Sequence, residues 1–254
     1  MKNIKPLIKV HPSTYILILM FLLSGYFLNI ILILIIVLFH ELGHITITKL
    51  LKYKIKEVNI YPSGGLTIIE KPINSSISHD ILIAIFGMIF QIILFGFFLL
   101  LYKYNLIRTY TYLLFKTYNK TILLFNLIPI IPLDGYQLLK SILEYLFSYK
   151  LSFYLSFIIS FIAILLFITR DLFSINNYFV LSFLCIKMVY SLKNFKYEHF
   201  KFLLERYLYS FKYHRIKYEK KENIDYLKKD TYHYFKRNNT YVSEKRVLHD
   251  KYNL

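Results

Sequence analysis

The chain is poor in the residues that disulfide scaffolds and cysteine metal clusters require. Its 254 residues contain a single cysteine and no tryptophan. One cysteine, at position 185 within an apolar run, excludes both a disulfide framework and a cysteine metal cluster. We interpret Cys185 as a small buried hydrophobic residue. The sequence also has no internal repeat and no glycine-rich phosphate loop, so a repeat protein and a P-loop nucleotide enzyme are not indicated.

Acidic residues are scarce as well, and the charges are unevenly distributed. The chain has 32 Lys and Arg against 15 Asp and Glu, a net charge of +17. Residues 11–192 are mostly uncharged apolar runs, whereas from residue 193 onward a charge recurs every few positions. We therefore predict a polytopic α-helical membrane domain over residues 1–192 and a small, basic, soluble C-terminal tail over 193–254.

The apolar runs predict six membrane-spanning helices. We place them at about 12–26, 29–49, 81–101, 109–128, 151–168 and 174–191. The start of the chain lacks the small-residue cleavage site of a signal peptide, so we expect the first span to be retained. An even number of spans puts both termini on one side, and the lysines near the N-terminus and in the tail make that side cytoplasmic.

Between the second and third spans, the stretch "KIKEVNIYPSGGLTIIEK" predicts a β-hairpin. Apolar residues alternate on either side of a Pro-Ser-Gly-Gly centre that contains Gly64 and Gly65. The hairpin would serve as a structural turn, or its edge would take up an extended substrate peptide by strand addition.

The second predicted span contains "HELGH", in which His40, Glu41 and His44 interrupt an apolar helix. Each such group costs about 2.5 kcal/mol or more at the centre of a membrane helix, so uncompensated placement is unfavourable. On a helix the two histidines share one face and can bind one zinc ion, with Glu41 beside it as a base. A chance match of this short pattern is the alternative.

A catalytic zinc site needs a third protein ligand. The candidates are Asp134 in "PLDG" and the pair His79–Asp80. The second and fourth spans run in the same direction, so Asp134 arrives at the same cytoplasmic depth as the histidines, and we favour it. Pro129 and Pro132 must break the helix before it. Asn126 either satisfies the carbonyls that these prolines free or contacts a substrate backbone.

"HELGH", the "PSGG" hairpin and "NLIPIIPLDG" together resemble the site-2 proteases, zinc metalloproteases that cut within membranes. The resemblance covers about residues 10–205. It implies one Zn²⁺ per chain, held by His40, His44 and Asp134, with Glu41 as the catalytic acid and base. The substrate-binding part would comprise Asn126, Gly64, Gly65, Pro129 and Pro132.

Lacking an inserted PDZ domain and ending in a soluble tail, the chain is most similar to the sporulation branch of this family. That branch implies a membrane-associated pro-sigma factor as substrate, inhibitory membrane proteins as partners, and a place in the mother-cell membrane around the forespore. The active site would face the cytoplasm. The sequence departs from the family at Gly87–Met88, where relatives have Gly-Pro, and at Tyr136 after Asp134–Gly135.

The tail is short for the nucleotide-sensing CBS domain of many family members, so we interpret it as a shortened or absent CBS domain and do not expect nucleotide binding. "TYHYFKRNNTYVSEKRVL" predicts a hairpin that turns at Asn238–Asn239, then a short helix. Its basic and aromatic residues favour anionic lipid or the substrate over nucleic acid; a solvated charged face is the plainer alternative. For the whole chain, the alternative function is a non-catalytic metal-binding membrane scaffold or transporter.

Overall fold

The structure is a computed structural model that describes residues 7–10, 12–61, 64–170, 175–238 and 240–252. The chain divides into two compact units. The first unit combines residues up to 71 with 82–127, and the second combines residues 72–81 with 128–254. Each unit has its own core and its own sheet.

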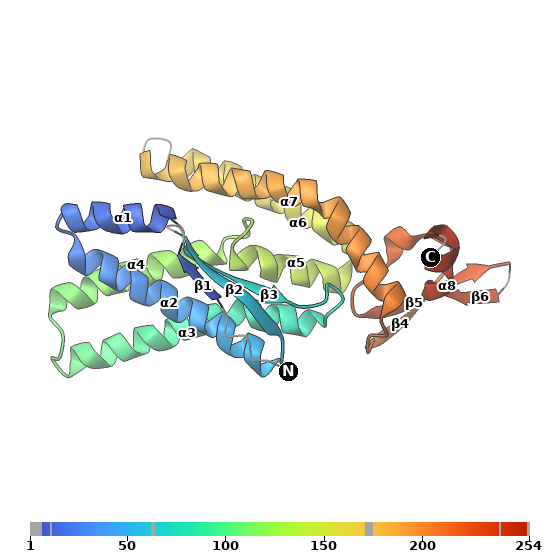
Figure 1. The fold of residues 1–254 in the computed structure, drawn as a ribbon, viewed down its shortest axis with the longest axis horizontal. Coiled ribbons are helices and arrows are strands. Elements are labelled where there is room, and N and C mark those ends of the chain that lie inside the picture. Colours follow the sequence, from blue (N-terminus) through green and yellow to red (C-terminus); the bar gives the residue numbers. More distant parts are fainter. Residues whose placement is uncertain (1–6, 11, 62–63, 171–174, 239, 253–254) are drawn as a thin grey trace. The chain divides into compact units, whose positions relative to one another are not determined.

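The first unit consists of four helices and a three-stranded sheet (Figure 1). Its helices are α1 (Pro12–Leu23), α2 (Phe27–Leu50), α3 (Ile77–Lys103, from Leu82 onward) and α4 (Thr109–Leu127). Gly25, with φ +75°, adopts a left-handed conformation between α1 and α2.

The core of this unit lies where α2, α3 and α4 meet. Leu32 and Ile36 from α2 pack with Leu94 from α3 and Phe115 from α4, all at most 3% exposed. A polar contact also joins two of these helices. The Asn29 amide nitrogen lies 2.6 Å from the Tyr118 hydroxyl, which ties α2 to α4. In this pair, each polar side chain finds a hydrogen-bond partner among the apolar residues of the bundle.

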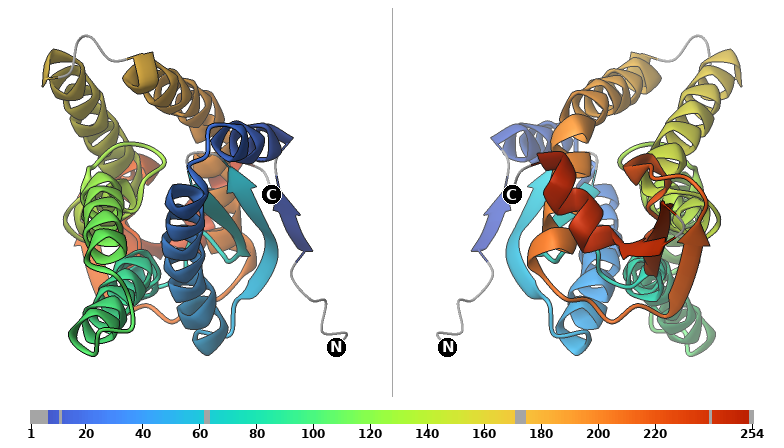
Figure 2. Two further views of the ribbon diagram at one scale, coloured as in Figure 1. Left: turned by 90° about the vertical axis from the view of Figure 1, so that its left-hand side faces the viewer. Right: turned by 90° about the vertical axis from the view of Figure 1, so that its right-hand side faces the viewer.

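The sheet of the first unit has the strand order β1–β2–β3, formed by Leu7–Val10, Lys54–Tyr61 and Gly64–Glu70. Strands β2 and β3 are antiparallel neighbours and run alongside α2 (Figure 2). The predicted turn residues Pro62 and Ser63 lie outside the described residues. Strand β1 was not predicted; it pairs parallel to β2, and Lys9 forms an ion pair of 2.9 Å with Glu57 across the two strands.

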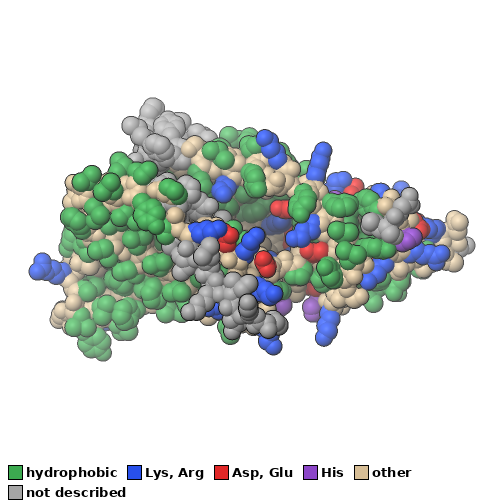
Figure 3. Space-filling view, in the orientation of Figure 1, with side chains coloured by type: hydrophobic (Ala, Val, Ile, Leu, Met, Phe, Trp, Pro, Cys, Tyr) green, Lys and Arg blue, Asp and Glu red, His purple; other side chains and the backbone are tan. Residues whose placement is uncertain are grey.

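Three helical segments in the described part of the chain are long and apolar enough to cross a membrane: α2, α3 and residues 149–167 of α6. Apolar side chains cover most of the face that the first unit presents in Figure 3. Helix α1 has only 12 residues, about 18 Å at 1.5 Å per residue, which is shorter than a hydrocarbon core. The three long apolar segments indicate an integral membrane protein. The six-span arrangement stays a prediction.

The second unit contains helices α5 (Asp134–Leu146), α6 (Tyr149–Arg170) and α7 (Ile175–Leu208) and a small C-terminal module. Helix α5 was not predicted. Helix α7 continues unbroken through residues 192 and 193, where the sequence suggested that the tail begins. Cys185 on α7 is exposed, so its interpretation as a buried residue was wrong.

The C-terminal module follows the predicted order of hairpin and short helix. Strands β4 (Arg215–Glu219) and β5 (Thr231–Arg237) are parallel, and β5 is antiparallel to β6 (Thr240–Ser243). A short 3₁₀ helix, Ile224–Tyr226, precedes β5, and α8 (Glu244–Tyr252) follows β6. Alternate residues of β5 are buried, and Phe235 packs with Phe202 of α7 and Leu248 of α8 in one core.

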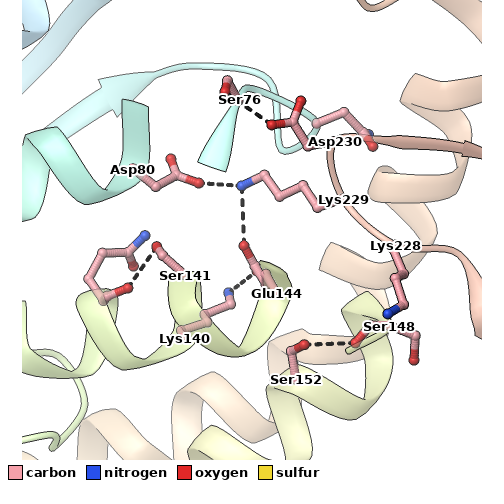
Figure 4. Close-up of polar contacts among 12 residues, drawn as sticks. Ser76, Asp80, Lys140, Ser141, Glu144, Ser148, Ser152, Lys228, Lys229 and Asp230 are labelled. Atoms are coloured by element: carbon pink, nitrogen blue, oxygen red, sulfur yellow. Dashed lines mark hydrogen bonds and ion pairs between the residues drawn. The ribbon is translucent and has the colours of Figure 1, made fainter. Parts of the chain in front are cut away.

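Charged side chains are buried within the second unit (Figure 4). The Lys229 ammonium donates to the carboxylate of Asp80, at the start of α3, and lies 3.3 Å from that of Glu144 on α5. All three residues are at most 4% exposed. Burial alone lowers the pKa of Lys229, but the two carboxylates outweigh it and raise the pKa, so the lysine stays charged. Elsewhere in this unit, Arg206 and Glu244 form a fully buried ion pair of 2.7 Å.

Candidate metal centre and active site

Helix α2 carries the candidate metal-binding and catalytic residues of the first unit. His40, Glu41 and His44 are buried, with 6%, 6% and 7% of their surfaces exposed. Because the histidines are four residues apart on a helix, both rings project from one face. The ligand atoms of the three residues all lie within 4.8 Å of one another. The structure thus brings the three predicted residues together.

A backbone carbonyl of the neighbouring helix orients His44. Nδ1 of His44 lies 2.7 Å from the carbonyl oxygen of Ile83 on α3. Because a carbonyl only accepts, Nδ1 carries the proton and donates, which leaves the lone pair on Nε2. Metal-binding histidines commonly have their tautomer fixed in this way, by a hydrogen bond from the nitrogen that does not face the metal.

The two Nε2 atoms of His40 and His44 lie 3.1 Å apart. In a tetrahedral site with Zn–N distances of about 2.1 Å, two nitrogen ligands would lie about 3.4 Å apart. The observed separation is close to that value, and the rings meet edge to face at 82°. The residues present therefore fit a zinc ion.

Two glycines let α2 and α3 approach closely enough for this geometry. A Cβ atom on Gly43 of α2 would overlap the carbonyl group of Phe86 on α3. A Cβ atom on Gly87 would lie 2.5 Å from Nε2 of His44 and 2.8 Å from Cε1 of His40. Because Gly87 has no side chain, it leaves room for the two imidazole rings. It lies four residues after Ile83, whose carbonyl orients His44.

Glu41, the candidate base, lies against strand β3. The Thr67 hydroxyl donates to Oε2 of Glu41 at 2.7 Å. Gly65 faces the same side chain: a Cβ atom there would lie 2.6 Å from Oε1 and would overlap the stem of Glu41. Gly65, predicted as a substrate-binding residue, therefore contacts the candidate base directly.

The other predicted residues are distributed over both units. Gly64 begins β3, and Asn126 is half-buried in the last turn of α4, both in the first unit. Asp134 is the first residue of α5, in the second unit. Pro129 and Pro132 lie between α4 and α5, which agrees with their predicted effect on the helix. The metal role of Asp134 stays a prediction, as do the substrate roles of Gly64, Asn126, Pro129 and Pro132.

Sequence reasoning missed Thr67, Gly87 and the carbonyl of Ile83. Gly87 was noted only because the next residue, Met88, replaces the proline of relatives, and no role was predicted for it. Thr67 follows Gly65 by two residues in a predicted strand, and residues two apart share a face. A backbone carbonyl has no sequence signal at all.

Three comparisons with known proteins agree on the family. The model of the "Peptidase M50B-like" family matches residues 13–130, which include "HELGH" and end before Asp134. Stage IV sporulation protein FB of Bacillus subtilis (strain 168) is 32% identical over 204 residues, which cover 79% of this chain and 71% of that protein.

A solved structure, a site-2 protease from Methanocaldococcus jannaschii, shares the fold. Its TM-score is 0.56 at 24% identity, with 74% of this chain and 92% of that chain covered. A buried His-Glu-x-x-His helix within this fold, in a chain so similar to a sporulation protein of the same family, leads to one conclusion: the chain belongs to the M50 site-2 protease family and is a metalloprotease.

Proposed function

We propose that this protein is a zinc-dependent intramembrane protease that hydrolyses a peptide bond of a membrane-associated protein. The observation that carries the proposal is the buried cluster of His40, Glu41 and His44 in an apolar helix long enough to span a membrane. Its three ligand-bearing side chains converge within 4.8 Å. Such a cluster is too costly in hydrocarbon to persist without compensation, and a metal ion would supply it.

One zinc ion per chain would be held by His40, His44 and a third ligand, for which we propose Asp134. The metallopeptidase family supports zinc, and the resemblance to site-2 proteases supports Asp134. When bound, the ion would supply Lewis-acid chemistry: it would polarise the scissile carbonyl and lower the pKa of a water molecule at the site.

The chain's own residues would move the protons. Glu41 lies next to the histidines without being needed as a ligand, so its carboxylate is available as general base toward the attacking water and then as general acid toward the departing amine. The hydrogen bond from His44 to Ile83 keeps the imidazole oriented during turnover. The buried position of the cluster limits access of bulk water.

The substrate must be extended to expose its peptide bond, and the sheet offers an edge for it. In the described order β1–β2–β3, strand β1 already covers one edge of β2, and β3 is the outer strand on the other side. Since β3 also contacts Glu41, a peptide added to its edge would run past the base. Gly64, Asn126, Pro129 and Pro132 are proposed to contact that peptide.

The similarity to stage IV sporulation protein FB supports a pro-sigma factor as substrate. By the same resemblance we propose the mother-cell membrane around the forespore as the location, inhibitory membrane proteins as partners, and cytoplasmic termini and active site. The basic tail, residues 193–254, would lie at the anionic cytoplasmic surface of the membrane.

Replacing the base tests the proposal. Glu41→Gln keeps the size of the side chain and removes its basicity, so co-expression with a tagged pro-sigma factor should yield no cleaved product. Glu222→Gln is the matched control, because Glu222 is exposed in the C-terminal module and lies outside the strand proposed to bind the substrate. Full cleavage by the Glu41 variant would show the mechanism to be wrong.

The third ligand has a separate test. Asp134→Ala should lower the zinc content of the purified protein, whereas Asp225→Ala, at a partly exposed ion pair in the same unit, should not. Unchanged zinc in the first variant would remove Asp134 from the site and leave the rest of the proposal standing.

A further inference from the structure

We propose that Thr67 is a positioning residue for the proteolytic reaction, whose hydroxyl holds the carboxylate of Glu41 in its working orientation. The inference rests on the proposed function and goes beyond it, because it makes strand β3 part of the catalytic machinery as well as a surface for the substrate.

The contact between the two side chains is short and partly shielded from water. Oγ1 of Thr67 lies 2.7 Å from Oε2 of Glu41, and Glu41 is only 6% exposed. A hydroxyl that donates to a carboxylate forms a charge-assisted hydrogen bond, about twice as strong as a neutral one. Oε2 of the carboxylate accepts this bond. The other oxygen, Oε1, would then carry out the proton transfer.

Strand β3 constrains Glu41 at a second point. Gly65 and Thr67 are two residues apart, so both face α2, and Gly65 lies against the stem of the glutamate. With the stem confined by Gly65 and one oxygen held by Thr67, Glu41 loses most of its rotational freedom before any substrate arrives.

The backbone pairing of the hairpin fixes the position of Thr67 itself. Thr67 pairs with Val58 of β2, and Gly65 pairs with Ile60. Val58 is buried, with 5% of its surface exposed, which anchors the register. Threonine is also stiff about χ1, so its hydroxyl keeps a constant direction from the strand.

A small misplacement of a catalytic group costs much of its rate advantage, on the order of 10²-fold for 1 Å. Thr67→Val has nearly the same shape as threonine but cannot donate. We therefore expect it to lower kcat by about 10- to 100-fold while KM changes little. Thr67→Ser retains the donor and should restore most of kcat.

The experiment uses the purified full-length protein in lipid vesicles with a tagged pro-sigma factor. Thr46→Val is the matched control, because its hydroxyl bonds to the carbonyl of Leu42 within α2. Zinc content and thermal midpoint are measured for each variant. The proposal is overturned if Thr67→Val keeps kcat within about twofold of the wild type, or if Thr67→Ser is as impaired as Thr67→Val.

A readout that does not depend on activity is the coupling between Thr67 and Glu41 in the zinc-free protein. Substitutions of residues in contact are non-additive. The shift in thermal midpoint for Thr67→Val combined with Glu41→Ala should therefore be smaller than the sum of the single shifts; additive shifts would count against the contact.

The activities of two variants separate failure of this inference from failure of the proposed function. If the Glu41→Gln variant still cleaves the substrate, the proposed function fails. If that variant is inactive while Thr67→Val is fully active, only this inference fails.

Discussion

Gly87 of helix α3 offers a sharp test of how the metal centre is packed. The change is Gly87→Ala, which adds one methyl group against the two histidines. The new Cβ would lie 2.5 Å from Nε2 and 2.6 Å from Cε1 of His44, well inside van der Waals contact. Either the imidazole or helix α3 must move, and the hydrogen bond of His44 to Ile83 must then lengthen.

The same helix contains a matched control. A Cβ atom on Gly96 would meet nothing within 4 Å. Both substitutions gain about 1 kcal/mol from the better helix propensity of alanine, so this gain cancels in the comparison. What remains is the cost of overpacking at Gly87, about 1–3 kcal/mol. The Gly87 variant should be less stable than the Gly96 variant by that amount.

The assay has two readings on purified protein. The thermal midpoint compares the stability of the two variants, and competition with a zinc chelator compares their affinity for zinc. Disturbing a hydrogen bond that orients a metal ligand typically weakens metal binding by about 10- to 100-fold, so Gly87→Ala should lose zinc at chelator concentrations that Gly96→Ala withstands. Equal zinc affinity and equal stability of the two variants would refute the packing described for His40 and His44.

Two further predictions concern the second unit. Lys229→Met removes the cation beside Asp80 and Glu144, and it should destabilise the unit by about 3 kcal/mol, seen as a lower thermal midpoint, because breaking a buried pair leaves buried negative charge; an unchanged midpoint would contradict this. For Glu244, burial raises the pKa, but its hydrogen bonds and the charge of Arg206 outweigh burial and lower it. The folded-state pKa of Glu244 lies below its unfolded value. The charged carboxylate therefore adds to the free energy of unfolding above about pH 4.3, and this stabilisation is lost as the pH falls through the folded-state pKa. The difference in thermal midpoint between wild type and Glu244→Gln should therefore shrink on acidification, and a constant difference would exclude the ion pair as its source.

Patterns with strong local constraints were predictable from the sequence. The three ionisable residues of "HELGH" are so costly in an apolar helix that we predicted a metal site from them, and the side chains of His40, Glu41 and His44 do converge. The C-terminal hairpin was predictable because Asn238, with φ +43°, supplies the turn conformation that asparagine tolerates. Asn239, the other residue of the predicted turn, lies outside the described residues.

Features that depend on tertiary contacts were not predictable. Helix α5 mixes leucines with Gln137, Lys140 and Glu144, so its hydropathy is too low for a span and its polar face is satisfied only in the fold. Strand β1 has four residues and depends on β2 for its hydrogen bonds. Asp80 is buried because Lys229, 149 residues away, neutralises it, and nothing in the local sequence indicates that partner.

The candidate site shows the same difference between local patterns, which are predictable, and tertiary contacts, which are not. The types and spacing of its residues are local, so the sequence was enough to predict them. Thr67 and Gly87 act through distances to α2 that only the packing of β3 and α3 creates. The sequence therefore predicted the candidate reacting groups, and the structure adds the neighbours that contact them.

The metal centre is tested most directly by the zinc content of the purified protein. Wild type should bind about one zinc ion per chain, as expected for a single catalytic site. Replacing both His40 and His44 by alanine should reduce this to near zero, because each histidine contributes a ligand nitrogen. A double variant that retains the zinc of the wild type would contradict the central claim that these two histidines form the metal centre.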